Sequence, residues 1–309
     1  DGVCNVPRLR WVTPTPMGAI EMSMARRGPL SSLTVRPEQA IVVGSTLVAG
    51  LVNIQVHAVG LNFRDVLNVM GMYPGEPGPP GGDCAGTVLE RTEGVVCLQR
   101  HTKVWGMLPG SLRAHASTSA QLLAPKPAQW SFAQACAMPT VWATVNMAFG
   151  ELARLKAEEQ VLVHAATGGV GLVAMQFAQR VGATVFGTAG RAEKHAQLQS
   201  SGVQHTASSR DCNSFVEEMG TMLANGATRT GLGVLLNSLS HDEYIPASLA
   251  LLRHGGRFAE IGKRGIWSAE EMRLTRPDVA YDVIAVDHRT VDDPAWMQGT
   301  LEACVRHAK

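Results

Sequence analysis

The chain of 309 residues has almost no net charge and no long apolar run. Its 27 Lys and Arg residues balance 26 Asp and Glu residues, and a net charge of +1 argues against nucleic acid or an anionic membrane as a partner. No apolar stretch approaches the roughly 20 residues that a membrane-spanning helix needs. Asp1–Trp11 also lacks the apolar stretch of a signal peptide. We therefore expect a cytoplasmic protein.

Metal-ligand patterns are missing as well. The six cysteines are scattered along the chain and form no Cys-x-x-Cys pair. A structural zinc site is therefore not expected, and we predict no metal. We interpret the cysteines as reduced, mostly buried thiols.

The residues present indicate two domains that meet near Gly150. Apolar residues make up 45% of the chain and charged residues 17%, as in globular proteins. Before Gly150, short β-type runs at Ala40–Val43, Val52–His57 and Gly86–Leu89 are separated by Gly and Pro, which are dense over Pro74–Gly82. This pattern predicts a mostly β domain over residues 1–150.

After Gly150, strand and helix patterns alternate. Val161–Ala166 is typical of a strand buried on both faces, and Gly169–Val181 of the helix that follows it. Further strands are expected at Ala183–Thr188, Gly233–Leu236, Arg257–Ile261 and Tyr281–Val286, and helices at Arg191–Ser200, Phe215–Leu223 and Ile245–Leu252. Repeated strand–helix units predict a Rossmann-type, doubly wound parallel sheet over residues 151–309.

A glycine cluster joins the first of these strands to its helix. Gly168, Gly169 and Gly171 allow a tight turn and close approach of a pyrophosphate, and the helix N-terminus offers free N–H groups. The position between a buried strand and a helix predicts a dinucleotide site.

The end of the second strand indicates which dinucleotide is bound. An NAD site usually has an acid there for the ribose 2′-hydroxyl, whereas Glu193 falls inside the following helix. Arg191 and Lys194 are expected on one helical face, where both can meet a 2′-phosphate. We therefore predict NADPH as the cofactor. The alternative is an ordinary charged helix start.

Several blocks, taken in order, resemble one known family. They are Val6–Leu9, Leu61–Leu67, Gly71–Gly75, Trp130–Ala135, Met138–Val141, His164–Gly171, Leu235–Leu239 and Gly255–Lys263. Together they resemble the enoyl reductase domains of polyketide synthases, which are also fatty-acid-synthase-like and belong to the zinc-free branch of the medium-chain dehydrogenase/reductase superfamily. The resemblance runs from about residue 6 to about residue 308. It implies that the first domain is a GroES-like substrate-binding domain.

The resemblance also implies a reaction. Hydride passes from NADPH to the β-carbon of a trans-2-enoyl thioester, an enolate forms, and a proton reaches the α-carbon. The expected partners are an acyl carrier protein that carries the enoyl chain and neighbouring synthase domains such as a ketoreductase.

Site residues follow from the matched blocks. Lys263 is implied as donor to the enolate, Asp287 as its acidic partner, and Tyr73 as a further candidate donor. Their alternatives are a solvated lysine, a helix cap and a packing anchor. Arg64 and Asp65 are expected to form a structural ion pair, and His164 to have a core or backbone role. The residues predicted to contact the cofactor are Thr167, Gly168, Gly169, Val170, Gly171, Arg191, Lys194, Asn237, Ser238, Gly262, Asn62 and Thr144.

The sequence departs from the family pattern at three points. Asp83 stands where Glu is usual, Trp142 stands where Tyr or Phe is common, and the final strand that normally returns to the first domain is expected to be missing after Lys309. Three other functions stay open at this point: a stand-alone quinone or enone reductase, a non-catalytic synthase domain, and a reductase repurposed for another step such as ring closure.

Overall fold

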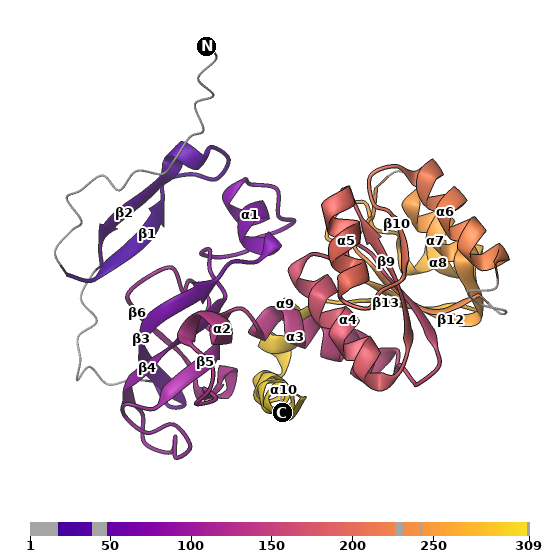
Figure 1. Cartoon of the computed structure of the whole chain (residues 1–309). Helices are drawn as coiled ribbons and strands as arrows, with labels where there is room; N and C mark the ends of the chain where they lie inside the picture. The colour runs from indigo at the N-terminus through magenta and orange to yellow at the C-terminus, as the bar shows by residue number, and fades with distance from the viewer. Residues whose placement is uncertain (1–17, 39–47, 226–230, 242, 308–309) are drawn as a thin grey trace, which may run out of the picture.

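The chain forms two lobes joined by helices (Figure 1). The computed structural model describes residues 18–38, 48–225, 231–241 and 243–307. The predicted strand at Ala40–Val43 and the block Val6–Leu9 lie outside these residues. No described helix has both the length and the apolar character to cross a membrane.

The first lobe is built on an antiparallel sheet of five strands in the order β6-β3-β4-β5-β7. These strands are β3 (Leu51–Gly60), β4 (Asp83–Arg91), β5 (Lys103–Met107), β6 (His115–Ser119) and β7 (Leu123–Pro125). A two-stranded ribbon, β1 (Ile20–Met24) and β2 (Leu33–Pro37), joins the sheet where the Met22 N–H donates to the Leu112 carbonyl at 2.8 Å. The strands expected at Val52–His57 and Gly86–Leu89 are thus confirmed within β3 and β4.

The second lobe is a six-stranded sheet in the order β10-β9-β8-β11-β12-β13, with every neighbouring pair parallel. This is the strand order of dinucleotide-binding folds, so the predicted Rossmann-type sheet is confirmed. Its strands are β8 (Gln160–Val163), β9 (Thr184–Ala189), β10 (His205–Ser208), β11 (Leu232–Asn237), β12 (Leu252–Glu260) and β13 (Ala280–Val283). The intervening helices are α4 (Gly169–Val181), α5 (Ala192–Ser200), α6 (Cys212–Ala224), α7 (Tyr244–Leu251) and α8 (Ala269–Thr275).

Strand β8 shows why the central strands read as unbroken apolar runs. Successive side chains of a strand point to opposite faces. Val161 and Val163 belong to one core cluster, and Leu162 belongs to the cluster on the other face. All three are fully buried, which confirms a strand that is covered on both faces. The strand is shorter than predicted, because it ends at Val163 and His164–Ala166 lie in the turn that follows.

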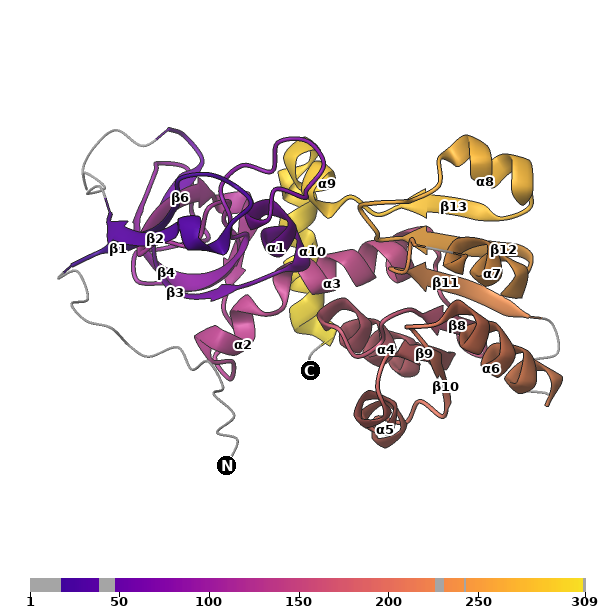
Figure 2. The same cartoon turned by 90° about the horizontal axis from the view of Figure 1, so that it is seen from above.

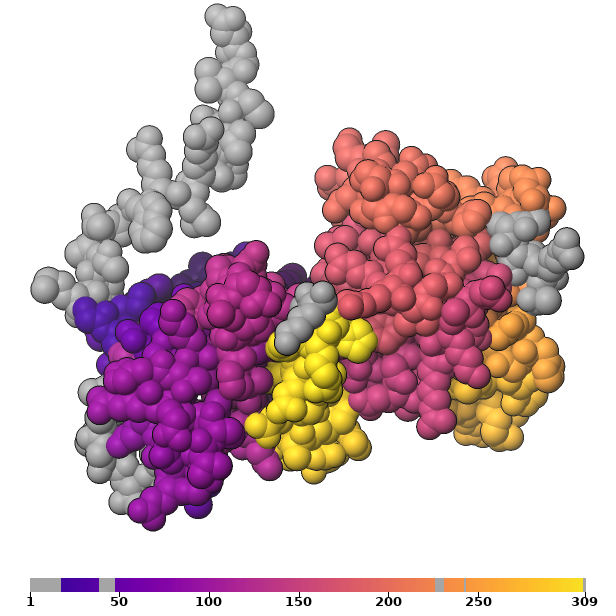
Figure 3. Space-filling view, turned by 60° about the horizontal axis from the view of Figure 1, so that its bottom comes forward, coloured from indigo at the N-terminus to yellow at the C-terminus, as the bar shows by residue number. Residues whose placement is uncertain are grey.

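Five helical segments connect the lobes. They are α2 (Phe132–Cys136), α3 (Pro139–Val145), the π-helix η3 (Asn146–Leu152), α9 (Val286–Asp292) and α10 (Pro294–His307). Helix α10 packs against α3 and β7, and its surface lies between the lobes (Figures 2 and 3). The buried Trp142 indole N–H donates to the Thr300 carbonyl at 2.8 Å and so fastens α3 to α10.

Two further expected elements differ in the structure. The strand expected at Tyr281–Val286 ends at Val283, and Val286 begins α9, so Asp287 lies in the first turn of a helix. An acid is favourable there because the N-terminal end of a helix carries partial positive charge. Arg191 has an extended backbone and precedes α5, because it serves as the N-cap residue of that helix.

Candidate active site

The glycine loop lies between the end of β8 and the start of α4. Gly168 is the N-cap residue of α4, and both Gly168 and Gly169 are exposed. A Cβ added to Gly171 would lie 2.6 Å from both the Cα and the carbonyl oxygen of Ala166, so no larger residue fits without movement. Exposed backbone at the start of a 13-residue helix gives an anion such as a pyrophosphate both access and N–H donors.

The buried side chain of His164 contacts Thr188, which in turn holds the backbone of this loop. Burial lowers the pKa of His164 to about 3, so the imidazole is neutral. Its Nε2 lies 2.9 Å from Ser248 Oγ and its Nδ1 lies 3.3 Å from Thr188 Oγ1. Thr188 Oγ1 also accepts from the N–H of Ala165, whose φ of 47° is unusual for a residue with a side chain. His164 therefore has the core and backbone role that was expected.

Three cations gather where β9 and β10 end. Arg191 and Lys194 are exposed at the start of α5, but Arg191 is the extended N-cap residue, so the two do not share a helical face as was expected. Arg210 lies two residues after β10, and the sequence reasoning missed it because that strand was not predicted. Its Nε lies 2.6 Å from the position that a Cβ on Gly190 would occupy, so its guanidinium stem covers the turn after β9.

The turns after β11 and β12 meet at the same edge of the sheet. Asn237 has no exposed surface, and its amide donates to Glu260 Oε2 at 2.6 Å while its Oδ1 accepts from the Leu239 N–H at 3.2 Å. The Ser238 Oγ is buried and has no hydrogen-bond partner among the described residues. Gly262 donates its N–H to Glu260 Oε1 at 2.5 Å. The side chain of Asn237 thus links the end of β11 to the end of β12.

The three predicted catalytic residues lie together, although they come from both lobes. The Tyr73 hydroxyl donates a short hydrogen bond to Asp287 Oδ2, and Lys263 Nζ lies 3.8 Å from Asp287 Oδ1. Lys263 Nζ also donates to the Ile284 carbonyl at 3.3 Å. The side chains of Lys263 and Asp287 are 28% and 25% exposed, so solvent still reaches the cluster.

The electrostatics of this cluster favour a charged Asp287 beside a protonated Tyr73. Burial and the hydrogen bond to Asp287 raise the pKa of Tyr73 to about 12. Burial alone would raise the pKa of Asp287, but the bond from Tyr73 and the charge of Lys263 outweigh it and hold that pKa below its usual value. A carboxylate held between a hydroxyl and an ammonium keeps the ammonium near one place at this edge of the sheet.

Asn62 and Thr144 use their polar atoms within the protein. The Asn62 amide donates to Asp83 Oδ2 at 3.0 Å, and Asp83 Oδ1 accepts from the Thr140 hydroxyl at 2.6 Å. The Thr144 hydroxyl donates to the Thr140 carbonyl at 2.8 Å and Thr144 is buried. Burial raises the pKa of Asp83 to about 6. Asp83 therefore joins the loop before α1 (Phe63–Val69) to the start of α3.

The ion pair expected between Arg64 and Asp65 was a wrong prediction. Asp65 accepts from the backbone N–H groups of Asn62 and Gly81, each at 2.8 Å. Arg64 donates to the Pro77 carbonyl at 2.5 Å, and its guanidinium carbon lies 5.4 Å from the centre of the Tyr73 ring. Consecutive residues of a helix point in different directions, so Arg64 and Asp65 contact different partners.

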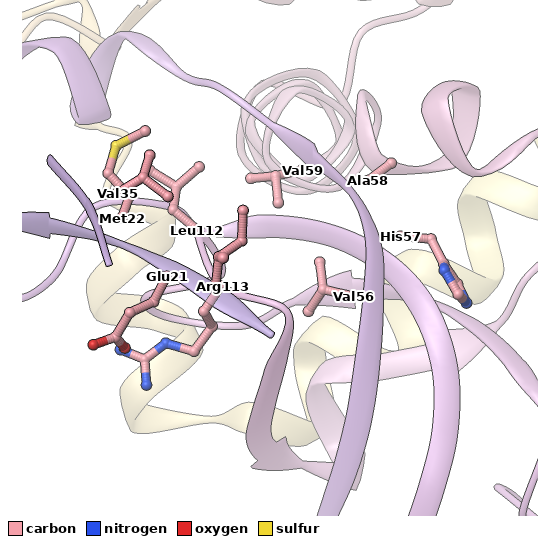
Figure 4. A pocket seen from close by; sticks show the side chains of 10 residues that line it. Glu21, Met22, Val35, Val56, His57, Ala58, Val59, Leu112 and Arg113 are labelled. Atoms are coloured by element: carbon pink, nitrogen blue, oxygen red, sulfur yellow. The ribbon is translucent and has the colours of Figure 1, made fainter. Parts of the chain in front are cut away.

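A pocket of about 290 Å³ lies elsewhere, between the β1–β2 ribbon and β3. Figure 4 shows Val56, Val59 and Leu112 gathered around it, while His57 points away from Val56 on the other side of β3. Its lining includes none of the predicted catalytic or cofactor-binding residues. Over residues 18–38, 48–225, 231–241 and 243–307, no group of three or more His, Cys, Asp or Glu side chains is arranged to hold a metal ion.

Comparisons with known proteins give a consistent result. Residues 169–299 match a family model described as zinc-binding dehydrogenase. A putative inactive phenolphthiocerol synthesis polyketide synthase type I, Pks1, from Mycobacterium tuberculosis is 39% identical over 97% of this chain, which spans only 18% of that protein's length. The crystal structure of CurK enoyl reductase is 35% identical, with a TM-score of 0.84 over 93% of this chain and 87% of that one. The CurF ER cyclopropanase from the curacin A biosynthetic pathway is 30% identical, with a TM-score of 0.83 over 92% of this chain and 86% of that one.

Proposed function

Because this chain belongs to the enoyl reductase family that occurs within polyketide synthases, we propose that it reduces a trans-2-enoyl thioester with NADPH. The thioester is carried by an acyl carrier protein, and the product is the saturated acyl thioester. The observation that carries the proposal is the cluster of Lys263, Asp287 and Tyr73 at the carboxyl edge of the parallel sheet. Ligands of open parallel sheets bind at that edge.

The cofactor end of the cleft fits NADPH. Gly171 leaves room for close approach at the pyrophosphate position, and α4 offers N–H groups there. Arg191, Lys194 and Arg210 supply cations for a 2′-phosphate, and the described turn after β9 carries no acid for a 2′-hydroxyl. When bound, NADPH supplies the hydride.

Lys263 acts on the charge that the hydride creates. As hydride adds to the β-carbon, the electrons of the double bond move toward the thioester oxygen, and the ammonium of Lys263 donates a hydrogen bond to that oxygen. A proton then reaches the α-carbon, from Lys263 or through solvent. Asp287 keeps Lys263 in place, and Tyr73 keeps Asp287 in place through its short hydrogen bond.

Oxidation of NADPH with crotonyl-pantetheine, compared with a quinone, tests the proposal. Turnover of the thioester is the expected result. Turnover of the quinone alone would assign the chain to quinone reduction, and failure to bind NADPH would mark it as non-catalytic.

A second candidate is ring closure, which the likeness to the CurF cyclopropanase favours. There the enolate carbon would displace a leaving group on the γ-carbon instead of taking a proton. A substrate with a γ-leaving group separates the two reactions by product mass, because ring closure expels that group whereas protonation retains it.

A further inference from the structure

The buried carboxylate of Glu260, at the end of β12, has no part in the mechanism above. Glu260 has no exposed surface. Its Oε1 accepts from the Gly262 N–H at 2.5 Å and from Ser240 Oγ at 3.0 Å, and its Oε2 accepts from the Asn237 amide at 2.6 Å. Burial raises its pKa despite these bonds. A buried acid carries a cost that a neutral residue would avoid, so its retention needs an explanation.

Glu260 connects the two turns that form the carboxyl edge of the sheet. Asn237 is the last residue of β11 and Ser240 belongs to the turn after it, while Gly262 belongs to the turn after β12. A Cβ on Gly262 would overlap Ser240 Oγ and lie 2.6 Å from Glu260 Oε1. The turns therefore meet without spare volume. The carboxylate accepts three hydrogen bonds in this contact, and the Asn237 amide also donates to Ser240 Oγ at 3.2 Å.

The same residue also fixes the neighbourhood of Lys263. Lys263 follows Gly262 directly, and its ammonium donates to the Ile284 carbonyl. The N–H of Ile284 in turn donates to the Glu260 carbonyl at 2.8 Å. The side chain of Glu260 thus holds the backbone that carries Lys263, while its main chain holds the residue that Lys263 Nζ contacts.

We propose that Glu260 is a positioning residue that sets the turn bearing Lys263 and this edge of the cofactor cleft. It acts on the reaction only through that turn. The inference rests on the proposed role of Lys263.

The proposal can be tested because Glu accepts hydrogen bonds through two oxygens, whereas Gln accepts through one oxygen and donates through its NH₂ group. Gln at position 260 keeps the shape but has one oxygen and one NH₂ group. With its oxygen toward Gly262, its NH₂ meets the NH₂ of Asn237, and Asn237 is held from turning because its Oδ1 accepts from Leu239. Glu260→Gln therefore leaves a buried donor without an acceptor. Adding Asn237→Asp restores a carboxylate on the other side of the same contact, and the total charge is again that of the wild type.

The experiment compares Glu260→Gln, Asn237→Asp and the double variant with the wild type. Single-turnover oxidation of NADPH by crotonyl-pantetheine measures the chemical step, and 2′,5′-ADP binding measures only the adenosine end of the site. We expect Glu260→Gln to slow the chemical step about 10- to 100-fold, because small misplacements of reacting groups have effects of this size. The affinity for 2′,5′-ADP should stay within about twofold of the wild type, and the double variant should regain the wild-type rate within about twofold.

Asn237→Asp alone should be at least as slow as Glu260→Gln, because it sets two carboxylates against each other. Glu270→Gln is the matched control, since Glu270 is an exposed acid in the first turn of α8. A wild-type rate in Glu260→Gln would overturn the inference. Equal loss in the single and double variants, or loss of 2′,5′-ADP binding in Glu260→Gln, would also overturn it, because the residue would then support the fold in general.

Failure of the proposed function would look different. In that case the wild type would not turn over the thioester. The inference would then be decided by NADPH affinity relative to 2′,5′-ADP affinity, a ratio that Glu260→Gln should lower and the double variant should restore.

Discussion

Lys263 and Asp287 should behave as one unit in the reaction. Their charged atoms lie 3.8 Å apart. Coulomb's law at that distance gives an attraction of about 1 kcal/mol in water and about 4 kcal/mol at an effective dielectric constant of about 20. Because about a quarter of each side chain is exposed, solvent screens the pair, and we expect a coupling energy of about 1–2 kcal/mol.

Kinetics of three variants measure this coupling. Lys263→Ala should slow single-turnover reduction of crotonyl-pantetheine about 10²–10³-fold, with a much smaller effect on NADPH binding, because Lys263 acts on charge that appears only as hydride arrives. Asp287→Asn should give a smaller loss in the same direction. The double variant should be faster than the product of the two single effects predicts, by about 5- to 30-fold.

The control is Arg264→Ala, which removes an exposed cation at the next position. It should leave the rate unchanged. Strictly multiplicative effects of the two single variants would refute the coupling. A near-normal rate in Lys263→Ala would move the proton donor to Tyr73 or to solvent.

Four further predictions concern the cofactor site, the metal and one buried acid. Changing Arg191 and Lys194 together to Ala should reduce the preference for NADPH over NADH, measured as a ratio of Kd values, by at least about tenfold, because two charge-assisted contacts are lost. Gly171→Ala should weaken NADPH binding in a fluorescence titration, because its Cβ would lie 2.6 Å from Ala166. Dialysis against a chelator should leave the reductase rate unchanged, and stoichiometric zinc in elemental analysis would contradict this. Asp83 holds its proton more tightly in the fold than in the unfolded chain, since burial raises its pKa to about 6, so its contribution to stability should grow as pH falls from 7 to 5. Urea unfolding should therefore show that wild type gains about 1 kcal/mol relative to Asp83→Asn over that range, and parallel pH profiles would disprove it.

Local patterns predicted most of the Rossmann lobe, although β10 and α8 were not predicted. Helix α4 begins at Gly169 and ends at Val181, as the sequence predicts, because a buried strand precedes it and Gly182 ends it with a φ of 86°. Other elements depend on distant contacts. The short helix α3 begins beside Asp83, which accepts from the backbone N–H of Thr140 at 3.1 Å. That contact joins residues far apart in the chain, and no periodic pattern in the sequence predicts it.

The same distinction applies to the site. Residues of the glycine loop are adjacent in sequence, so spacing alone could propose them. Tyr73 and Asp287 are 214 positions apart, and only the resemblance to a family suggested that they belong to one site. Arg210 was missed because the strand before it, β10, was not predicted. Glu260 was missed although it lies within the matched block Gly255–Lys263, because only Gly262 and Lys263 of that block were given roles. Each is recognised only once the turns after neighbouring strands are seen to meet.

The departure at Asp83 bears on whether the site is intact. A shorter acid at this position could have left the start of α3 without its partner. Instead Asp83 is buried and accepts from the Asn62 amide, the Thr140 N–H and the Thr140 hydroxyl. The segment before α1 therefore stays attached to α3, and the loop that follows α1 presents Tyr73 to Asp287 in α9. Since Asp83 makes these bonds, the departure does not by itself favour a non-catalytic domain.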